Sequence, residues 1–150
     1  MSKNTDTPDH RQQAPFIFAI RAVYARRILD GSKRWEFRTR MPSVRLGDLA
    51  LIYESRGRGR IVGAFTVGSL LHTMSPGVLW QTVEEMDPGS HGIDRSAYNA
   101  YFEGRAAGVA IGVVAPVALD WPLPPGMHAP QSWARWVGPW HGCEREAAGS

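Results

Sequence analysis

Residues 31–38 read GSKRWEFR, and the interpretation of the whole chain starts from this stretch. Charged and aromatic side chains alternate along it, as in a β-strand. The alternation places Glu36 between Arg34 and Arg38 on one strand face, roughly 7 Å from each, where guanidinium groups would keep the carboxylate ionised. Such a group can bind a nucleobase edge while further arginines bind phosphate. A salt-bridge ladder on an exposed sheet face is the equally open alternative.

Short strands and three helices are predicted around this stretch. Ser75-Pro76 is a good start for a helix, Asp94 can cap another, and Pro116 separates the last two strands. Six strands with sparse helices indicate the α+β class, specifically a small mixed or antiparallel β-barrel, because closing the sheet removes exposed edges. The predicted strands are residues 16–21, 33–40, 49–54, 60–71, 107–115 and 117–121, and the predicted helices are residues 22–30, 76–86 and 95–103.

The length of 150 residues fits one domain, and 43% hydrophobic with 21% charged residues is an ordinary globular composition. We expect a disordered leader over residues 1–14, a single domain over 15–141 and a frayed tail over 142–150. The polar N-terminus has no signal-peptide core, and no apolar run is long enough to span a membrane. These features predict a cytoplasmic protein without a membrane partner.

The charge of the chain is unevenly distributed. Residues 21–60 hold eleven basic and four acidic residues, a balance of +7, whereas residues 61–150 hold four arginines and eight acids, a balance of −4. A basic segment in an otherwise acidic domain is typical of a face that binds an anionic ligand. Solvated surface charge is the competing explanation.

Metal and cofactor sites are not expected. The single cysteine, Cys143, cannot form an internal disulfide. His128, His141 and Cys143 match no familiar zinc spacing. The chain also has no phosphate-binding glycine loop of the nucleoside-triphosphatase kind.

The stretch resembles the signature of the ASCH domain, a branch of the PUA-like β-barrel superfamily. Its pattern G-x-K-x-x-E-x-R, after a short strand and helix, is matched by Gly31, Lys33, Glu36 and Arg38. The resemblance extends from about residue 15 to residue 137. Its other carriers are Gly47-Asp48, Tyr53-Glu54-Ser55, Ile61-Val62-Gly63, Tyr101-Phe102-Glu103-Gly104, Val109-Ala110-Ile111 and Pro130-Gln131-Ser132-Trp133.

The resemblance implies a cleft, lined by the signature lysine, glutamate and arginine, that binds RNA, DNA or a nucleoside. Some ASCH-type proteins are similar to amidohydrolases that deacetylate N4-acetylcytidine, and others have been proposed to be ribonucleases. In the amidohydrolases the motif lysine is paired with a threonine three residues on and with a later glutamate. Lys33 matches the lysine, Glu36 replaces the threonine, and Glu103 is a candidate for the later glutamate.

The role of Lys33 depends on its surroundings. It must lie on an irregular lead-in to share a cleft with Glu36, because strict alternation puts the two on opposite faces. Nearby arginines would lower the pKa of Lys33 and Glu36 would raise it, so the sequence leaves the direction open. We favour a charged Lys33 that binds phosphate or polarises a carbonyl.

These features predict a module that binds nucleic acid, RNA in preference to DNA, in a basic cleft. Glu36 and Ser55 would bind a base edge, and Tyr53, in preference to Tyr101, would stack on the base. Trp35 is expected in the core. The alternative is a hydrolase of modified nucleosides or RNA with Lys33, Glu36 and Glu103 as catalytic residues. The predicted nucleic-acid-binding residues are Arg21, Lys33, Glu36, Arg38, Tyr53, Ser55, Arg56, Arg58 and Arg60.

Overall fold

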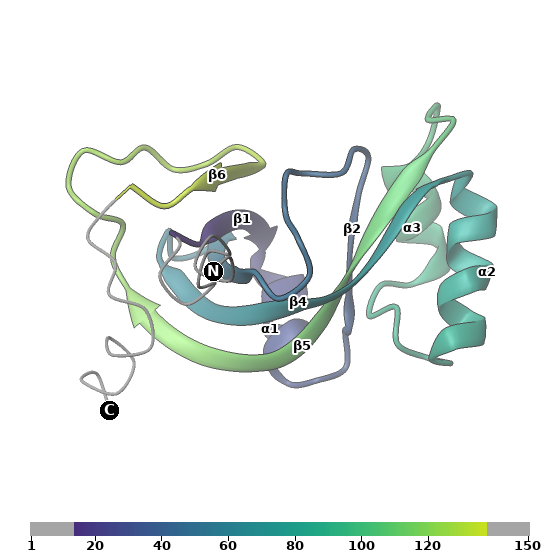
Figure 1. Cartoon of the computed structure of the whole chain (residues 1–150), viewed down its shortest axis with the longest axis horizontal. Helices are drawn as coiled ribbons and strands as arrows, with labels where there is room; N and C mark the ends of the chain where they lie inside the picture. Colours follow the sequence, from purple (N-terminus) through teal and green to yellow (C-terminus); the bar gives the residue numbers. More distant parts are fainter. Residues whose placement is uncertain (1–13, 138–150) are drawn as a thin grey trace, which may run out of the picture.

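A curved six-stranded sheet with three helices makes up the domain in the computed structural model, which describes residues 14–137 (Figure 1). The predicted leader, except Ala14, and the predicted tail lie outside the described residues. The strands are β1 (Phe16–Arg21), β2 (Trp35–Arg38), β3 (Leu49–Ser55), β4 (Ile61–Met74), β5 (Gly108–Trp121) and β6 (Trp133–Arg135), and the helices are α1 (Ala22–Leu29), α2 (Pro76–Met86) and α3 (Arg95–Tyr101).

The sheet is mixed, with the strand order β2-β5-β4-β3-β1-β6. Only β1 and β3 pair in parallel, since α1 provides the crossover between β1 and the rest of the sheet. The sheet curves like a barrel but does not close, and β2 and β6 form its edges. Arg38 on β2 reaches across the opening, where its Nη2 donates to the carbonyl of Ala19 at 3.1 Å and its Nη1 to Ser132 Oγ at 3.0 Å. The predicted α+β, barrel-like class is confirmed.

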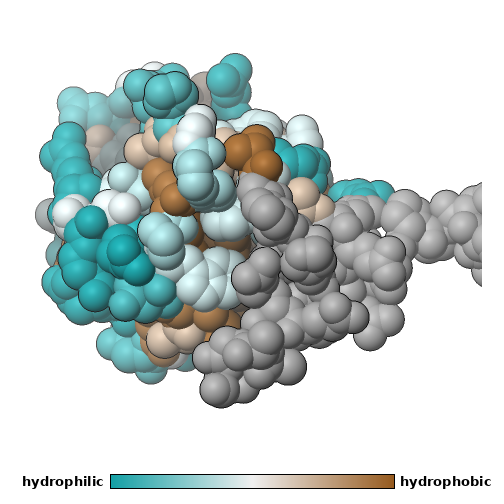
Figure 2. All heavy atoms as spheres, turned by 90° about the vertical axis from the view of Figure 1, so that its left-hand side faces the viewer, coloured by the Kyte–Doolittle hydropathy of each residue, from teal (hydrophilic) through white to brown (hydrophobic). Residues whose placement is uncertain are grey.

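Two cores hold the elements that surround the opening. α1 buries Ala25 and Ile28 against the apolar side chains of the sheet, including Phe18 and Phe65. α2 and α3 pack at one end of the sheet, shown on the right in Figure 1, over Trp35 and other aromatic side chains. At the opposite end, Figure 2 shows apolar residues only as small patches between polar ones. Within residues 14–137 no helix is long and apolar enough to cross a membrane.

Two predicted elements are wrong. β5 runs unbroken through Pro116, because a register shift against β4 between Ala64 and Thr66 lets β5 carry an extra residue there. Ala115 takes up the distortion with a φ of 52°, and proline, which has no N–H to pair, is tolerated at such a bulge. The predicted strands end at residue 121, whereas residues 133–135 form the additional strand β6 on the edge of β1.

We expect the short helix α3 to depend on its N-terminal cap. The carboxylate of Asp94 accepts a hydrogen bond from the amide of Ala97 at 2.9 Å. Asp94→Ala should lower the free energy of unfolding by about 1 kcal/mol, because a helix-terminal N–H loses its partner. Asp94→Asn, which retains a capping oxygen, should stay close to the original protein in urea denaturation. Equal losses in both variants would show that the negative charge, and not the cap, stabilises α3.

Candidate functional site

The opening between the sheet edges contains a cavity of about 500 Å³. The end of β1, the start of α1, β2 with its lead-in, and α3 form its wall. Its polar and aromatic lining is Arg21, Tyr24, Lys33, Glu36, Phe37, Arg38, Tyr98 and Tyr101. Four of the predicted binding residues therefore meet in one place.

Glu36 and Arg38 form a buried ion pair in this cavity. Arg38 Nη2 lies 2.9 Å from Glu36 Oε2, and both residues are less than a tenth exposed. Arg34 does not flank Glu36 as the alternation predicted, because β2 begins only at Trp35. Arg34 instead turns to the surface, where its Nε and Nη2 donate to the two carboxylate oxygens of Asp87 at 2.6 and 3.0 Å.

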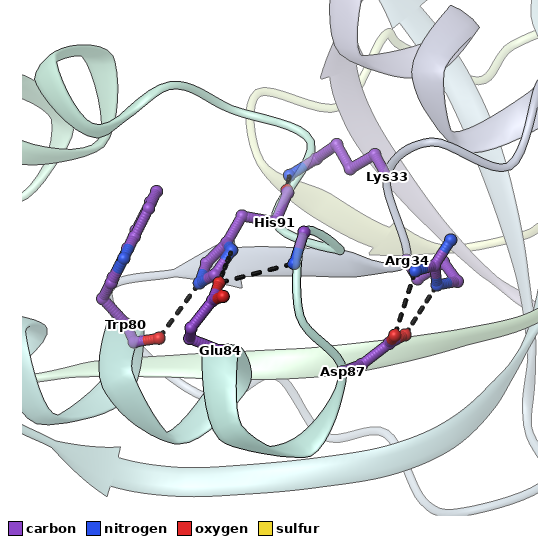
Figure 3. Close-up of polar contacts among 7 residues, drawn as sticks. Lys33, Arg34, Trp80, Glu84, Asp87 and His91 are labelled. Carbon is purple, nitrogen blue, oxygen red and sulfur yellow. Dashed lines mark hydrogen bonds and ion pairs between the residues drawn. The ribbon is translucent and has the colours of Figure 1, made fainter.

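Lys33 lies on the irregular lead-in to β2 and lines the same cavity as Glu36. It is 3% exposed, and its ammonium lies 4.9 Å from the ring centre of Phe37 and 5.5 Å from that of Tyr24. Lys33 Nζ donates a hydrogen bond to the carbonyl oxygen of His91 at 3.2 Å, as Figure 3 shows. Lys33 therefore has the position that it needs in order to share a cleft with Glu36.

The loop between α2 and α3, residues 87–92, holds Lys33 from outside. Three of its backbone carbonyls accept hydrogen bonds from the Arg34 amide, Lys33 Nζ and Arg27 Nη1. The His91 ring stacks on Trp80 with 3.7 Å between centroids, and its Nε2 lies 3.0 Å from the Trp80 carbonyl oxygen (Figure 3). Gly92, with φ +69°, presses its backbone onto the Lys33 side chain, where a Cβ would overlap. The loop therefore fixes the lysine by close packing.

Burial lowers the pKa of Lys33 to about 8, with smaller contributions in the same direction from Arg27 and Arg38. Glu36 opposes this shift and raises the pKa. The direction that the sequence left open is therefore set by desolvation more than by the neighbouring charges. About a tenth of the lysine is a neutral amine at pH 7.

Several predicted site residues lie away from the cavity. Tyr53 packs in a cluster with Ile17 and Leu51 and does not line the cavity. Ser55 is the register partner of Arg21 and leads into the exposed Arg56.

Three further predicted site residues are paired with acidic side chains or lie away from the cavity. Arg58 pairs with Glu54 at 3.3 Å and Arg60 with Asp120 at 2.6 Å. Glu103 is exposed in the turn that follows α3 and does not line the cavity.

The sequence reasoning missed Tyr24 on the cavity wall and the loop that holds Lys33, and it favoured Tyr53 over Tyr101 as the stacking residue. Tyr24 and Tyr101 line the cavity, and Tyr101 is 46% exposed while the amide of Thr39 hydrogen bonds to its hydroxyl. Partial burial raises the pKa of that phenol. A signal was present in the aromatic pattern of α3, but the loop at residues 90–92 has no feature that predicts where its carbonyls point.

No metal site emerges from the described part of the chain. Within residues 14–137 no three histidine, cysteine or acidic side chains lie close enough to hold an ion. Of the three weighed ligands, His141 and Cys143 lie outside the described residues.

These observations define an open, barrel-like α+β domain whose cavity takes Lys33, Glu36 and Arg38 from β2 and its lead-in and Arg21 from the end of β1. The sequence profile of the ASCH domain matches residues 18–118, and the chain belongs to the ASCH domain family. A comparison with curated proteins found no match.

Solved structures share the fold. The chain is similar to ASCH from Zymomonas mobilis, with a TM-score of 0.72 and 19% identity over 93% of each chain. Two single-substitution variants of that protein match with TM-scores of 0.68 and 0.67 at 18% identity, over 91% of this chain and 96% and 94% of theirs. At this identity the likeness establishes the fold alone.

Gly92 should be intolerant of a side chain. Gly92→Ala places a methyl group into Lys33 and also strains a backbone with φ +69°. Gly89→Ala is the matched control, because Gly89 has a φ of +76° but nothing within 4 Å of an added Cβ. We expect Gly89→Ala to cost about 1 kcal/mol and Gly92→Ala about 1–3 kcal/mol more in urea unfolding. Equal losses would mean that the loop does not press on Lys33.

The buried Lys33 should make stability depend on pH. Its pKa is about 8 in the folded protein and 10.5 in an unfolded chain, so the unfolded state binds more protons between these values. The free energy of unfolding therefore rises with pH across that window. Lys33→Met removes a penalty on the order of 3 kcal/mol that is fully present below pH 8.

The measurement is urea unfolding at pH 7 and pH 10.5. The gain in free energy of unfolding of Lys33→Met over the original protein should be larger at pH 7 than at pH 10.5. Arg34→Met, from the exposed pair with Asp87, should show no such difference between the two pH values. A Lys33→Met effect that does not change with pH would mean that the amine titrates normally.

Proposed function

We propose that this domain binds RNA and places one nucleobase in the cavity beside Lys33, Glu36 and Arg38. The observation that carries the proposal is the lining itself, which combines a cavity of about 500 Å³ with cations, one carboxylate and an accessible aromatic ring. A volume of this size is typical of small-ligand sites. RNA is found in the cytoplasm, and we propose that location for the protein.

The polar groups of the cavity are suited to a base edge. The Glu36 carboxylate can accept hydrogen bonds from an exocyclic amine or ring N–H. The Lys33 ammonium can donate to a base carbonyl. The Glu36–Arg38 pair holds the carboxylate in one orientation, and a fixed acceptor recognises a base more selectively than a mobile one.

Tyr101 is the residue suited to stacking. Its ring lines the cavity and is about half exposed, with an edge-on contact to Phe102 at 4.8 Å. The ring of Tyr24 is already in contact with Lys33 and Arg27. Tyr53, the stacking residue expected from the sequence, packs in another cluster.

Hydrolysis is the second candidate function, and the pKa of Lys33 favours it. A cavity amine with a pKa of about 8 can accept a proton near neutral pH. It could activate water for attack on an N4-acetylcytidine-type amide, or take the 2′-hydroxyl proton in metal-independent RNA cleavage. Product formation that Lys33→Ala abolishes, with a rate that rises up to about pH 8, would establish this function.

The binding proposal is tested on Tyr101. Tyr101→Ala should lower the affinity for a single-stranded RNA 12-mer about 5- to 150-fold, because a stacked base contributes roughly 1–3 kcal/mol. Tyr101→Phe keeps the ring and should stay close to the original affinity. Fluorescence anisotropy measures binding, and a gel of the same samples shows whether the RNA remains intact.

Two results would contradict the proposal. One is the absence of binding to both the 12-mer and the four nucleoside 5′-monophosphates. The other is an affinity of Tyr101→Ala equal to that of the original protein. Cleavage of the RNA 12-mer in the gel would instead support the hydrolase function.

A further inference from the structure

The arginines of this chain fall into two groups, those that bind other parts of the protein and those that do not. Residues 14–137 contain thirteen arginines. Most of them bond a carboxylate, a carbonyl or a ring, as do Arg34, Arg38 and Arg60. Within the described residues, five show no side-chain hydrogen bond, ion pair or ring contact: Arg21, Arg26, Arg40, Arg56 and Arg105.

Of these five unpaired arginines, Arg21 lines the cavity and three others adjoin residues at its rim. Arg21 lines its mouth, and Arg56 directly follows Ser55, the parallel register partner of Arg21. We call this pair the first arm. On the α3 side, Arg40 follows Thr39, whose amide bonds the Tyr101 hydroxyl, and Arg105 lies close enough to Tyr101 to influence its phenol. We call Arg40 and Arg105 the second arm.

Unpaired guanidinium groups are the ones that can take up phosphate. An arginine already bound to a carboxylate must break that pair first, whereas an exposed unpaired one only releases counterions. The two arms lie on different sides of the cavity, one at the joined ends of β1 and β3 and the other where β2 and α3 end. Phosphates could therefore be held on both sides of a bound base.

We infer that the two arms bind the backbone of a single-stranded RNA, so that the ligand is an internal nucleotide and not a free nucleoside. This inference rests on the proposed function of the cavity. A base inside the cavity must be unstacked from its neighbours, which favours a single strand. The inference also adds Arg40 and Arg105 to the predicted nucleic-acid-binding residues. It removes Arg58 and Arg60 from them, because these two are paired with Glu54 and Asp120.

The test is the double variant Arg40→Gln/Arg105→Gln. Its affinity for a single-stranded RNA 12-mer should fall about tenfold at 100 mM salt, and the slope of log K against log salt should decrease by about 1.4, since each phosphate contact on a single strand contributes about 0.7. Its affinity for nucleoside 5′-monophosphates should not change, because neither residue lines the cavity.

Arg26→Gln is the matched control. Arg26 is equally exposed and unpaired within residues 14–137, but it lies on α1 and not at the cavity, so its loss should leave the salt slope unchanged. All three substitutions are on the surface, and urea midpoints will confirm that the fold is retained.

The outcomes separate this inference from the proposed function. If the original protein binds nucleotides but the double variant has the salt slope of Arg26→Gln, the second arm does not bind phosphate. The inference that the backbone is held on both sides of the base is then wrong, and the cavity proposal stands. An equal loss for the 12-mer and the monophosphates also overturns the inference, because the second arm would then act inside the cavity. If the original protein binds neither ligand, both this inference and the proposed function are wrong.

Discussion

The contact on which the rest of the site depends is the Arg38 guanidinium at the opening of the sheet. A six-stranded sheet of this curvature leaves β2 and β6 as edges, and backbone hydrogen bonds do not join them. Arg38 on β2 replaces those bonds, because it donates to Ala19 and to Ser132, which are hydrogen-bonded neighbours on the opposite, β1–β6 edge. Its remaining charge is balanced by Glu36. The same side chain therefore spans the gap between the edges and fixes the carboxylate that faces the cavity.

Holding a lysine beside this pair is costly, and the loop over residues 87–92 explains how the fold tolerates it. Water is replaced by the rings of Tyr24 and Phe37 and by one carbonyl, that of His91. These partners interact more weakly with a cation than water does, and so the charged form of Lys33 is disfavoured. Shifted pKa values of this kind cluster at functional sites, which makes the surroundings of Lys33 the candidate site of this domain.

Local patterns predicted much of this architecture but not the contacts between distant segments. The strand–helix–turn–strand order before residue 38 follows from hydrophobic periodicity, and the caps at Ser75 and Asp94 follow from their residue types. β6 could not be predicted, because three residues on a sheet edge have no periodicity of their own. The location of Tyr53 was missed for a similar reason: both faces of β3 are covered, so the alternation along it does not reveal that none of its residues lines the cavity.

The charge pattern of the sequence also does not predict the contacts between distant segments. The basic segment carries a balance of +7, but its arginines do not form one basic face. Acids of the other half reach back to neutralise part of it, since Arg34 binds Asp87 and Arg60 binds Asp120. Counting charges along the chain therefore overestimates how many can meet a ligand. Of the arginines without a partner within residues 14–137, Arg21 lines the cavity and Arg40, Arg56 and Arg105 adjoin residues at its rim. The uneven charge of the sequence thus leaves a small group of unpaired cations where we propose that an anionic polymer binds.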